Sequence, residues 1–164
     1  APKDYRDEAL EILTNGGWTL NEERGVMEKK TKTGTVELAF SISTGNAPEL
    51  KRAAEIIQES WRAIGADVSL QIFETNDLNQ NVIRPRKYDA LFFGEVVGRD
   101  YDLYPFWHSS QRNDPGLNIA LYTNISADKI LETIRGESDR AAREKSLAEL
   151  ISIIDKDHPA AFVY

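Results

Sequence analysis

The chain has 164 residues, 41% hydrophobic and 29% charged, a composition typical of a soluble globular protein rather than a disordered or fibrous one. A formal net charge of -7, with the 20 Lys and Arg scattered along the chain, argues against nucleic acid as a partner. The absence of cysteine excludes disulfides, cysteine nucleophiles and zinc–thiolate sites, and two histidines are too few for a histidine-rich metal site. We therefore predict neither a metal nor a cofactor. No apolar run approaches the ~20 residues that a transmembrane helix needs.

The start of the chain is predicted to hold a helix, a loop and a strand. Apolar residues at helical spacing favour an amphipathic helix over residues 4–16. Residues 21–34 are charged and interrupted by Gly, which indicates a loop or an edge hairpin. Alternation of apolar and polar side chains then predicts a strand over Thr35–Ser43, with one apolar face formed by Val36, Leu38, Phe40 and Ile42.

The middle of the chain reads as alternating helices and strands. Asn46 is the expected N-cap of an amphipathic helix over residues 47–64, and a strand, Asp67–Phe73, follows it. A short helix over residues 76–84, with Leu78 and Val82 pointing inward, and a third strand over residues 88–93 continue the series. Such alternation predicts the α/β fold class, with a parallel sheet, right-handed crossovers and helices on its faces.

The last third of the chain is predicted to be mostly helical. A helix capped by Ser126 precedes a longer one, which Ser138 or Asp139 starts and which runs to about Asp157. The residues of this longer helix that are expected to point inward are Ala142, Leu147, Leu150, Ile151 and Ile154. An apolar strand is expected to begin at Ala160.

The loop after the third strand is the predicted site. Ligands of α/β proteins bind beyond the carboxyl ends of strands, where loops leave the sheet. The apolar strand ends at Gly94, and the loop that follows, as far as Gln111, is rich in charged and aromatic side chains. Tyr104 and Trp107 in this loop either stack on a ligand or cover one end of the core.

The two histidines are interpreted as structural. His108 is followed by Ser109 and Ser110, but nucleophilic catalysis needs a base, a nucleophile and an acid in tertiary register, and adjacency does not supply this. No Gly-x-Ser-x-Gly elbow occurs in the chain. His158 precedes Pro159 at a predicted helix end, where it is expected to cap the helix and interact with its dipole.

Four segments carry a resemblance through their order and spacing. They are ALEILTNGGW (residues 9–18); AEIIQ (54–58) with IGADV (64–68); KYDA (87–90), which runs into Phe93-Gly94 and an Asp-containing loop; and DKIL (128–131), followed by Arg143 and His158-Pro159-Ala160. No single segment is specific. Their succession resembles the carboxy-terminal lobe of the extracytoplasmic solute-binding proteins of the peptide/nickel ABC-importer family, bacterial solute-binding family 5.

This resemblance implies a fold and a domain organisation. We expect a mostly parallel sheet flanked by helices, forming one lobe of a type II periplasmic-binding-protein fold. Residues 1–164 would then be a single α/β domain and a fragment of a longer, two-lobed protein. In whole members of the family the chain enters this lobe from the other lobe and returns to it.

The resemblance also implies binding rather than catalysis. Such a lobe helps to capture a peptide or a similar small solute outside the cytoplasmic membrane, and closure of the two lobes presents the solute to ABC permease subunits. We expect a monomeric, extracytoplasmic protein that associates with the membrane only through an amino-terminal signal or lipid anchor missing from this sequence. The solute is left open between a peptide, a nickel chelate, an oligosaccharide and an opine.

The resemblance names candidate ligand-binding residues as well. In peptide-binding relatives, an Asp in the loop after the third strand pairs with the α-ammonium group of the substrate. Asp100 is the favoured equivalent and Asp102 the alternative, because a carboxylate in a closing cleft forms a strong charge-assisted hydrogen bond with a cation. Arg99 either joins the site or occupies the carboxylate of Asp100. Tyr104 and Trp107 complete the set of candidates.

Two other functions stay open. A small α/β hydrolase would use His108 and Asp100, and it requires a ring nitrogen of His108 within hydrogen-bond reach of a hydroxyl and of an acid. A protein-interaction module would instead expose a large apolar patch.

Overall fold

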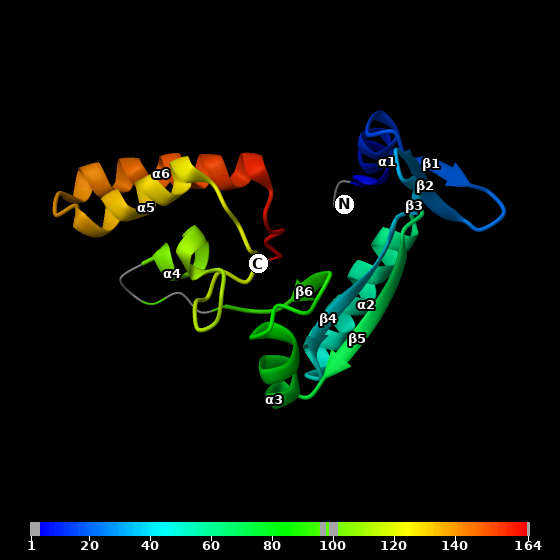
Figure 1. Ribbon diagram of the computed structural model, residues 1–164, viewed down its shortest axis with the longest axis horizontal. Coiled ribbons are helices and arrows are strands. Elements are labelled where there is room, and N and C mark those ends of the chain that lie inside the picture. Colours follow the sequence, from blue (N-terminus) through cyan, green and yellow to red (C-terminus); the bar gives the residue numbers. More distant parts are fainter. Residues whose placement is uncertain (1–3, 96–97, 99–101, 164) are drawn as a thin grey trace. The chain divides into compact units, whose positions relative to one another are not determined.

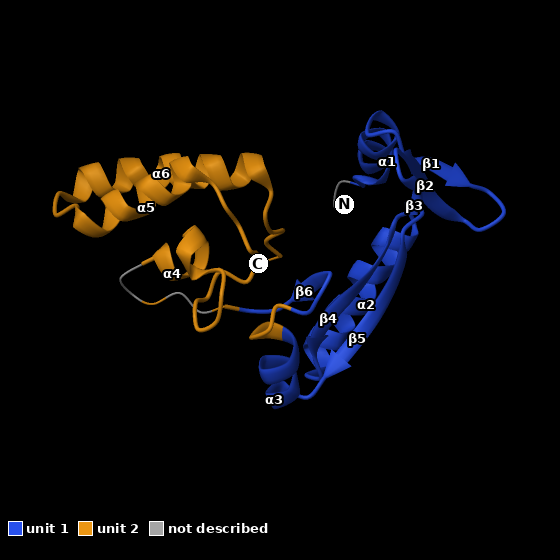
Figure 2. Ribbon diagram, in the orientation of Figure 1, with its two compact units in different colours: residues 1–82, 87–94 blue, residues 83–86, 95–164 orange. Residues whose placement is uncertain are grey.

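The structure, a computed structural model, describes residues 4–95, 98 and 102–163. Its contacts divide the chain into two units, coloured separately in Figure 2. Unit 1 comprises Ala1–Val82 and Lys87–Gly94, and unit 2 comprises Ile83–Arg86 and Glu95–Tyr164. The chain therefore passes from one unit to the other three times.

Unit 1 contains a three-stranded parallel sheet. Its strands β4 (Ala39–Gly45), β5 (Asp67–Phe73) and β6 (Ala90–Phe92) lie in the order β5-β4-β6 (Figure 1). The helix α2 (Pro48–Arg62) connects β4 to β5 and packs against both strands. The predicted parallel sheet with a flanking helix is confirmed, and β5 has the predicted bounds.

The core of unit 1 lies between this sheet and α2. Ile42, Ala66 and Val68 are buried, and Ile57 of α2 packs against them. Val68 is 0% exposed. Burying an aliphatic side chain of this size contributes about 1.5–3 kcal/mol, so these contacts hold the helix on the sheet.

A second sheet in unit 1 corrects the strand predicted over Thr35–Ser43. It is an antiparallel meander of β1 (Thr19–Asn21), β2 (Val26–Thr31) and β3 (Gly34–Glu37), which follows the helix α1 (Arg6–Asn15). The single predicted strand is therefore wrong: it is two strands, β3 and β4, in different sheets. The hairpin alternative for residues 21–34 is confirmed.

Leu38 marks the break between these two strands. Its N–H donates to the carbonyl of Met27 in the meander (2.7 Å), and its carbonyl accepts from the N–H of Asp67 in the parallel sheet (2.8 Å). Val36, predicted to share a buried face with Leu38, is 48% exposed. Alternation of apolar and polar residues indicates an extended backbone but not the strand with which it pairs. The sequence pattern therefore does not show that the chain changes sheets at Leu38.

Two of the predicted helix starts are also wrong. The residue before α2 is Ala47, which makes no side-chain cap, so Asn46 is not the N-cap. Asn124 rather than Ser126 caps α5 (Ile125–Gly136), and its side chain accepts from the N–H groups of Ser126 (2.9 Å) and Ala127 (3.2 Å). Candidate caps near a helix start compete, and the tertiary path of the incoming chain selects among them.

The short helix predicted over residues 76–84 is present in two parts. One turn of α-helix, α3 (Thr75–Asp77), continues as a π-helix, η1 (Leu78–Ile83). Leu78 and Val82 are buried, as the apolar spacing predicted.

Unit 2 combines short helices with a helical hairpin. The short elements are α4 (Tyr104–Trp107) and the 3-10 helix η2 (Ser109–Gln111). The hairpin pairs α5 with α6 (Arg140–Asp157), which Asp139 caps by accepting the N–H of Ala142 (2.8 Å). The residues at the centre of the core are Tyr122, Ala127, Leu131, Leu150 and Ile154.

The carboxy-terminal part of unit 2 agrees with the sequence at some positions and differs at others. Leu150 and Ile154 are buried, but Ile151, predicted to point inward, is 56% exposed because it lies about 100° around the helix from Leu150. His158 occupies the C-cap of α6, as expected. The strand expected from Ala160 is not formed over residues 160–163. No helix among the described residues is long and apolar enough to cross a membrane.

Candidate ligand-binding site

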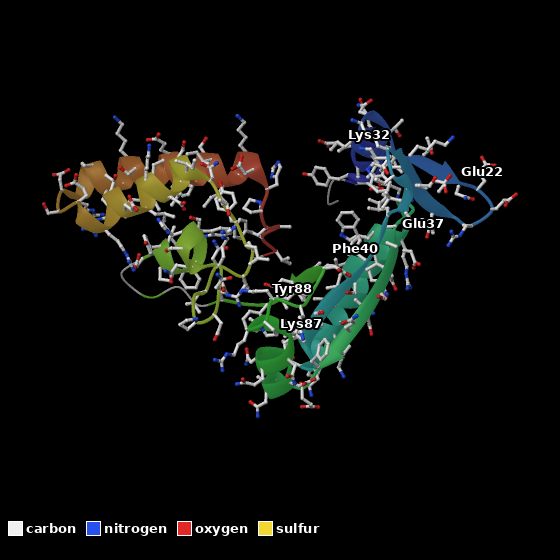
Figure 3. The ribbon with its side chains drawn as sticks, in the orientation of Figure 1. Glu22, Lys32, Glu37, Phe40, Lys87 and Tyr88 are labelled. Atoms are coloured by element: carbon white, nitrogen blue, oxygen red, sulfur yellow. The ribbon has the colours of Figure 1, made fainter. Side chains whose placement is uncertain are left out.

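The predicted site begins where β6 ends. Lys87 and Tyr88, labelled in Figure 3, lead into this strand, and the chain leaves the sheet at Phe93, which is 41% exposed. Two of the predicted site residues, Arg99 and Asp100, lie outside the described residues. The described residues of the loop include Glu95 and the chain from Asp102 onward, which belong to unit 2.

Glu95 is the first charged residue after β6. Desolvation by the surrounding protein raises the pKa of its carboxyl to about 7, and the positive charge of Arg86 opposes this rise. The residue as a whole is exposed, so we expect the energetic effect of this shift to be small. Glu95 lies in the predicted loop but is not among the predicted site residues.

Asp102 is held by a residue that sequence reasoning missed. Arg135 of α5 donates from Nη2 to Oδ2 of Asp102 (2.5 Å) and from Nε to both carboxylate oxygens (3.2 Å each). The N–H of Tyr104 also donates to Oδ1 (3.1 Å). The pKa of Asp102 is lowered, first by the Arg135 hydrogen bonds. With its charge paired in this way, Asp102 does not offer a free carboxylate.

Tyr104 lies in a stack of three side chains. The guanidinium of Arg135 sits 4.0 Å from the centre of the Tyr104 ring, a cation–π contact. The Tyr104 and His108 rings are stacked, with centroids 4.1 Å apart and planes 17° from parallel. Both candidates, Asp102 and Tyr104, are thus brought together by Arg135, which lies 33 residues beyond Asp102 in the chain.

The ring of His108 is buried between this stack and α5. The N–H of Ser110 donates to Nδ1 (3.1 Å), so Nδ1 is an acceptor and the neutral ring carries its proton on Nε2. Nε2 is buried and has no hydrogen-bond partner among the described residues. Two carboxylates lie nearby, with Glu132 Oε1 at 3.5 Å and Asp128 Oδ1 at 3.9 Å.

This arrangement meets half of the geometric requirement for a hydrolase. The Ser110 hydroxyl lies 2.8 Å from His108 Nδ1, but both carboxylates lie farther from Nε2 than an ordinary hydrogen bond reaches. Asp128 is also engaged elsewhere, because it accepts the N–H of Ser109 (2.8 Å) and its hydroxyl (2.5 Å). The cluster is better described as a cap that ties η2 to α5.

Trp107 belongs to the core of unit 2. Its ring packs edge-on against Tyr122, with centroids 6.0 Å apart and planes at 84°, and it also contacts the ring of Phe162. Of the two interpretations that the sequence left open for Trp107, packing is the one for which this geometry provides contacts.

Arginine side chains fix the turn that follows η2. Arg84 pairs with Asp114 through two hydrogen bonds (2.9 and 2.8 Å). Arg86 donates to the carbonyls of Ile83 (2.6 Å), Arg112 (2.9 Å) and Gly116 (2.6 Å). These guanidinium groups are occupied by partners within unit 2.

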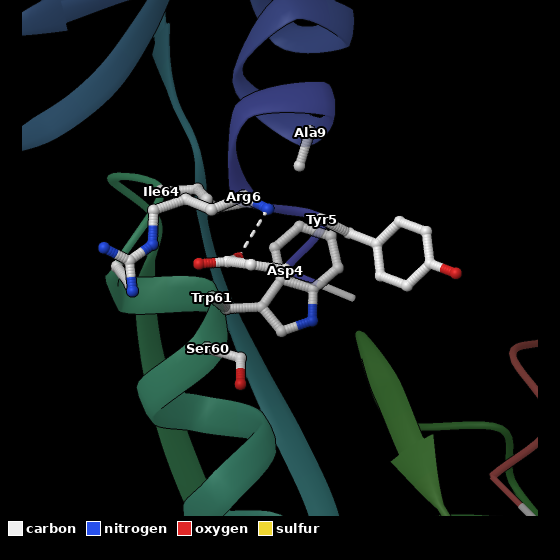
Figure 4. A pocket seen from close by; sticks show the side chains of 8 residues that line it. Asp4, Tyr5, Arg6, Ala9, Ser60, Trp61 and Ile64 are labelled. Carbon is white, nitrogen blue, oxygen red and sulfur yellow. Dashed lines mark hydrogen bonds between the residues drawn. The ribbon is translucent and has the colours of Figure 1, made fainter. Parts of the chain in front are cut away.

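Unit 1 has a cavity elsewhere, between α1 and α2. Its volume is about 450 Å³, and Figure 4 shows the rings of Tyr5 and Trp61 beside it. The N–H of Arg6 donates to the carboxylate of Asp4 (3.0 Å) at its edge. Among the described residues, no group of three His, Cys, Asp or Glu side chains is placed to hold a metal ion.

Comparison with known proteins identifies the family. Residues 1–116 match the family described as bacterial extracellular solute-binding proteins, family 5 Middle. The chain therefore belongs to this family, and the resemblance seen in its sequence is confirmed. Membership also confirms the predicted extracytoplasmic location.

Individual relatives cover nearly the whole chain. The oligopeptide-binding protein AppA of Bacillus subtilis is 29% identical over 158 residues, which are 95% of this chain and 28% of AppA. The nickel-binding periplasmic protein of Escherichia coli is 28% identical over 159 residues, 94% of this chain and 26% of that protein. The chain thus spans little more than a quarter of the length of these relatives.

Solved structures agree with the sequence comparison. AppA in complex with a nonapeptide matches 93% of this chain and 30% of its own chain, with a TM-score of 0.84 and 28% identity. NikZ of Campylobacter jejuni, solved with Ni(L-His), matches 94% of this chain and 30% of its own, with a TM-score of 0.78 and 24% identity. The α/β fold, of the type II periplasmic-binding kind, is confirmed. The B. subtilis and E. coli relatives are both named as binding proteins.

Proposed function

We propose that this chain is the ligand-binding carboxy-terminal lobe of an oligopeptide-binding protein that serves an ABC importer. The observation that supports this most is the similarity to AppA, which extends over 95% of the chain and is matched by a TM-score of 0.84 to the AppA–nonapeptide complex. In the full-length protein, two lobes would close over the peptide by hinge motion and present it to the permease. We expect the full-length protein to act as a monomer.

Asp100 is the proposed partner of the peptide's α-ammonium group. Asp102, its rival, is occupied by Arg135 through three hydrogen bonds, so we prefer Asp100 for this role. Arg99, in the same loop, is proposed to be part of the ligand-binding site. Tyr104 and Trp107 are proposed to shape one wall of the site through their packing rather than by stacking on the ligand.

The proposed role is binding without catalysis. Among the described residues, His108 has a hydroxyl within hydrogen-bond distance but no carboxylate, so that part of the chain does not supply the orienting acid of a hydrolase. Because the chain spans 28% of AppA, it would form one wall of a cleft, and we expect weak or undetectable peptide affinity for the isolated chain. Micromolar binding of a peptide to the isolated chain would contradict this expectation.

The test uses the full-length protein and isothermal titration calorimetry. We expect binding of a synthetic nonapeptide with free termini, and a large loss of affinity in Asp100→Asn, because a charge-assisted bond to the ammonium group is removed. The control is Asp155→Asn, which removes an acid of α6, outside the loop. Unchanged affinity in Asp100→Asn would refute the role of that carboxylate.

Nickel is the alternative ligand, because the E. coli relative is named as a nickel-binding protein and NikZ was solved with Ni(L-His). Nickel ions are therefore titrated alone and with L-histidine. Nickel binding without peptide binding would overturn the proposal. Native mass spectrometry of the purified full-length protein reads any ligand that it retains.

A further inference from the structure

The strand β6 is too short to fix its own position by backbone pairing. It pairs with β4 at three positions: Ile42 opposite Ala90, Ser43 opposite Leu91 and Thr44 opposite Phe92. By comparison, β4 and β5 pair along the whole length of both strands, from Ala39 opposite Asp67 to Gly45 opposite Phe73. A parallel strand that slips by one residue moves about 3.3 Å and turns each side chain to the other face.

A carboxylate continues the ladder at the start of β6. Oδ2 of Asp89 accepts both the backbone N–H of Ser41 (2.9 Å) and its hydroxyl (2.8 Å). Ser41 directly precedes the first paired residue of β4, so Asp89 takes the place of one more carbonyl of a backbone partner. These two bonds, the backbone one first, lower the pKa of Asp89.

A hydroxyl does the same at the end of β6. Oγ1 of Thr44 donates to the carbonyl of Phe92 (2.8 Å), the last residue of the strand. Thr44 is 0% exposed, so water cannot replace this bond. The three-residue strand is thus held at each end by a side chain, at Ser41 and at Thr44 of β4.

We infer that Asp89 and Thr44 lock the register of β6 and thereby act as positioning residues for the ligand-binding loop. The lock fixes where the chain leaves the sheet, at Phe93 and Gly94, and the loop that carries Asp100 starts from this point. Neither residue needs to touch the ligand. The inference rests on the proposed function, because it concerns the same loop.

The experiment uses the full-length protein with the nonapeptide as probe. Asp89→Ala and Thr44→Val each remove one end of the lock, and Thr44→Val keeps the shape of the side chain. We expect each to weaken peptide binding by about tenfold, because Asp89→Ala removes two bonds of an exposed carboxylate and Thr44→Val removes one bond of a buried hydroxyl. Asp89→Asn keeps an acceptor for Ser41 and is expected to restore most of the affinity.

Hydrogen–deuterium exchange without ligand tests the register separately. Amides of residues 90–94 are expected to exchange faster in both variants, while those of β5 stay unchanged. Asp67→Ala removes an exposed acid from the same sheet and should alter neither readout. Met27→Ala, a core change in the antiparallel meander, should lower the melting temperature without weakening peptide binding, which separates positioning from loss of stability.

The outcomes separate this inference from the proposed function. If wild-type protein binds the nonapeptide and both lock variants bind it equally well, the inference is wrong. If the wild type binds no peptide, the proposed function is wrong, and so is the role of Asp89 and Thr44 in ligand binding. Hydrogen exchange of residues 90–94 still tests whether these two residues hold the register of β6. If Asp89→Ala does not fold, Thr44→Val and Asp89→Asn carry the test.

Discussion

The parallel sheet of unit 1 and the loop region of unit 2 are stabilised in different ways. In the sheet, β4 and β5 pair continuously and α2 covers them with an apolar stripe, so repeated backbone bonds and burial set the structure. In residues 102–124, short helical turns are joined by side chains that bond to distant partners, as Asp102 does to Arg135. The long β4–β5 pairing should therefore tolerate changes of polar residues, whereas short elements, the turns of unit 2 and the three-residue strand β6, depend on them.

The largest effect on stability is expected in the apolar core of unit 2. Leu150 is 0% exposed between α5 and α6, and Leu150→Ala should lower the free energy of unfolding by about 2–5 kcal/mol through lost burial and a cavity. Ile151→Ala, at the exposed neighbour, is the control and should cost far less. Urea unfolding followed by circular dichroism measures both, and equal losses would show that the helical hairpin is not packed as described.

Asn118 tests whether polar contacts hold the loop region. Its side chain is 0% exposed, donates to the carbonyls of Trp107, His108 and Tyr122 (3.3, 3.1 and 3.0 Å), and accepts from the N–H of Tyr122 (3.0 Å). Asn118→Ala leaves these groups buried without partners, and we expect a loss of about 2–3 kcal/mol in unfolding free energy.

The matched control for Asn118 is Asn113→Ala in the exposed turn nearby. It should change the unfolding free energy by less than about 0.5 kcal/mol. A loss in Asn118→Ala as small as that of the control would contradict the view that this asparagine organises the loop region.

Asp102 gives a smaller, pH-dependent effect. Because the Arg135 bonds lower its folded pKa, its stabilising contribution is present above the unfolded pKa of about 3.9 and is lost as the pH falls through the folded value. The pair is partly exposed, so Asp102→Asn should cost only about 0.5–1 kcal/mol at pH 7, and the difference from wild type should shrink toward pH 3. Chemical unfolding at both pH values measures this, with Asp155→Asn as control; a difference that does not change with pH would exclude the ion pair as its source.

Glu95 is expected to show the smallest effect, with the opposite sign. Its folded pKa of about 7 lies above the unfolded value, so the folded state holds a proton more tightly and stability falls as the pH rises from about 4.5 to 7. Glu95→Gln should remove this fall and stabilise the protein slightly at pH 8, by less than about 1 kcal/mol, since the residue is exposed. Melting temperatures of wild type and variant between pH 5 and pH 8 provide the measurement, and parallel pH profiles would refute the shift.

The sequence by itself determined the alternation of strands and helices, the parallel sheet, the bounds of β5 and the family. Each rests on local information: apolar residues at a period of two or 3.6, breaks at Gly and Pro, and the order of short segments. The buried positions of Leu78 and Leu150 followed from the same periodicity. The sequence left Ser138 and Asp139 as alternative starts of α6, and Asp139 is the cap, through a bond that spans three residues.

The tertiary structure alone decided where strands change partners and which polar side chains meet. Leu38 joins two sheets because its backbone bonds to Met27 in one and to Asp67 in the other. The apolar–polar pattern around residue 38 does not indicate this change of partner. Arg135 reaches Asp102 across 33 residues, and Asp89 reaches Ser41 across 48. Such contacts form only when the intervening chain is folded. The sequence therefore predicts a site in the loop after β6 but does not predict the long-range side-chain contacts around that loop.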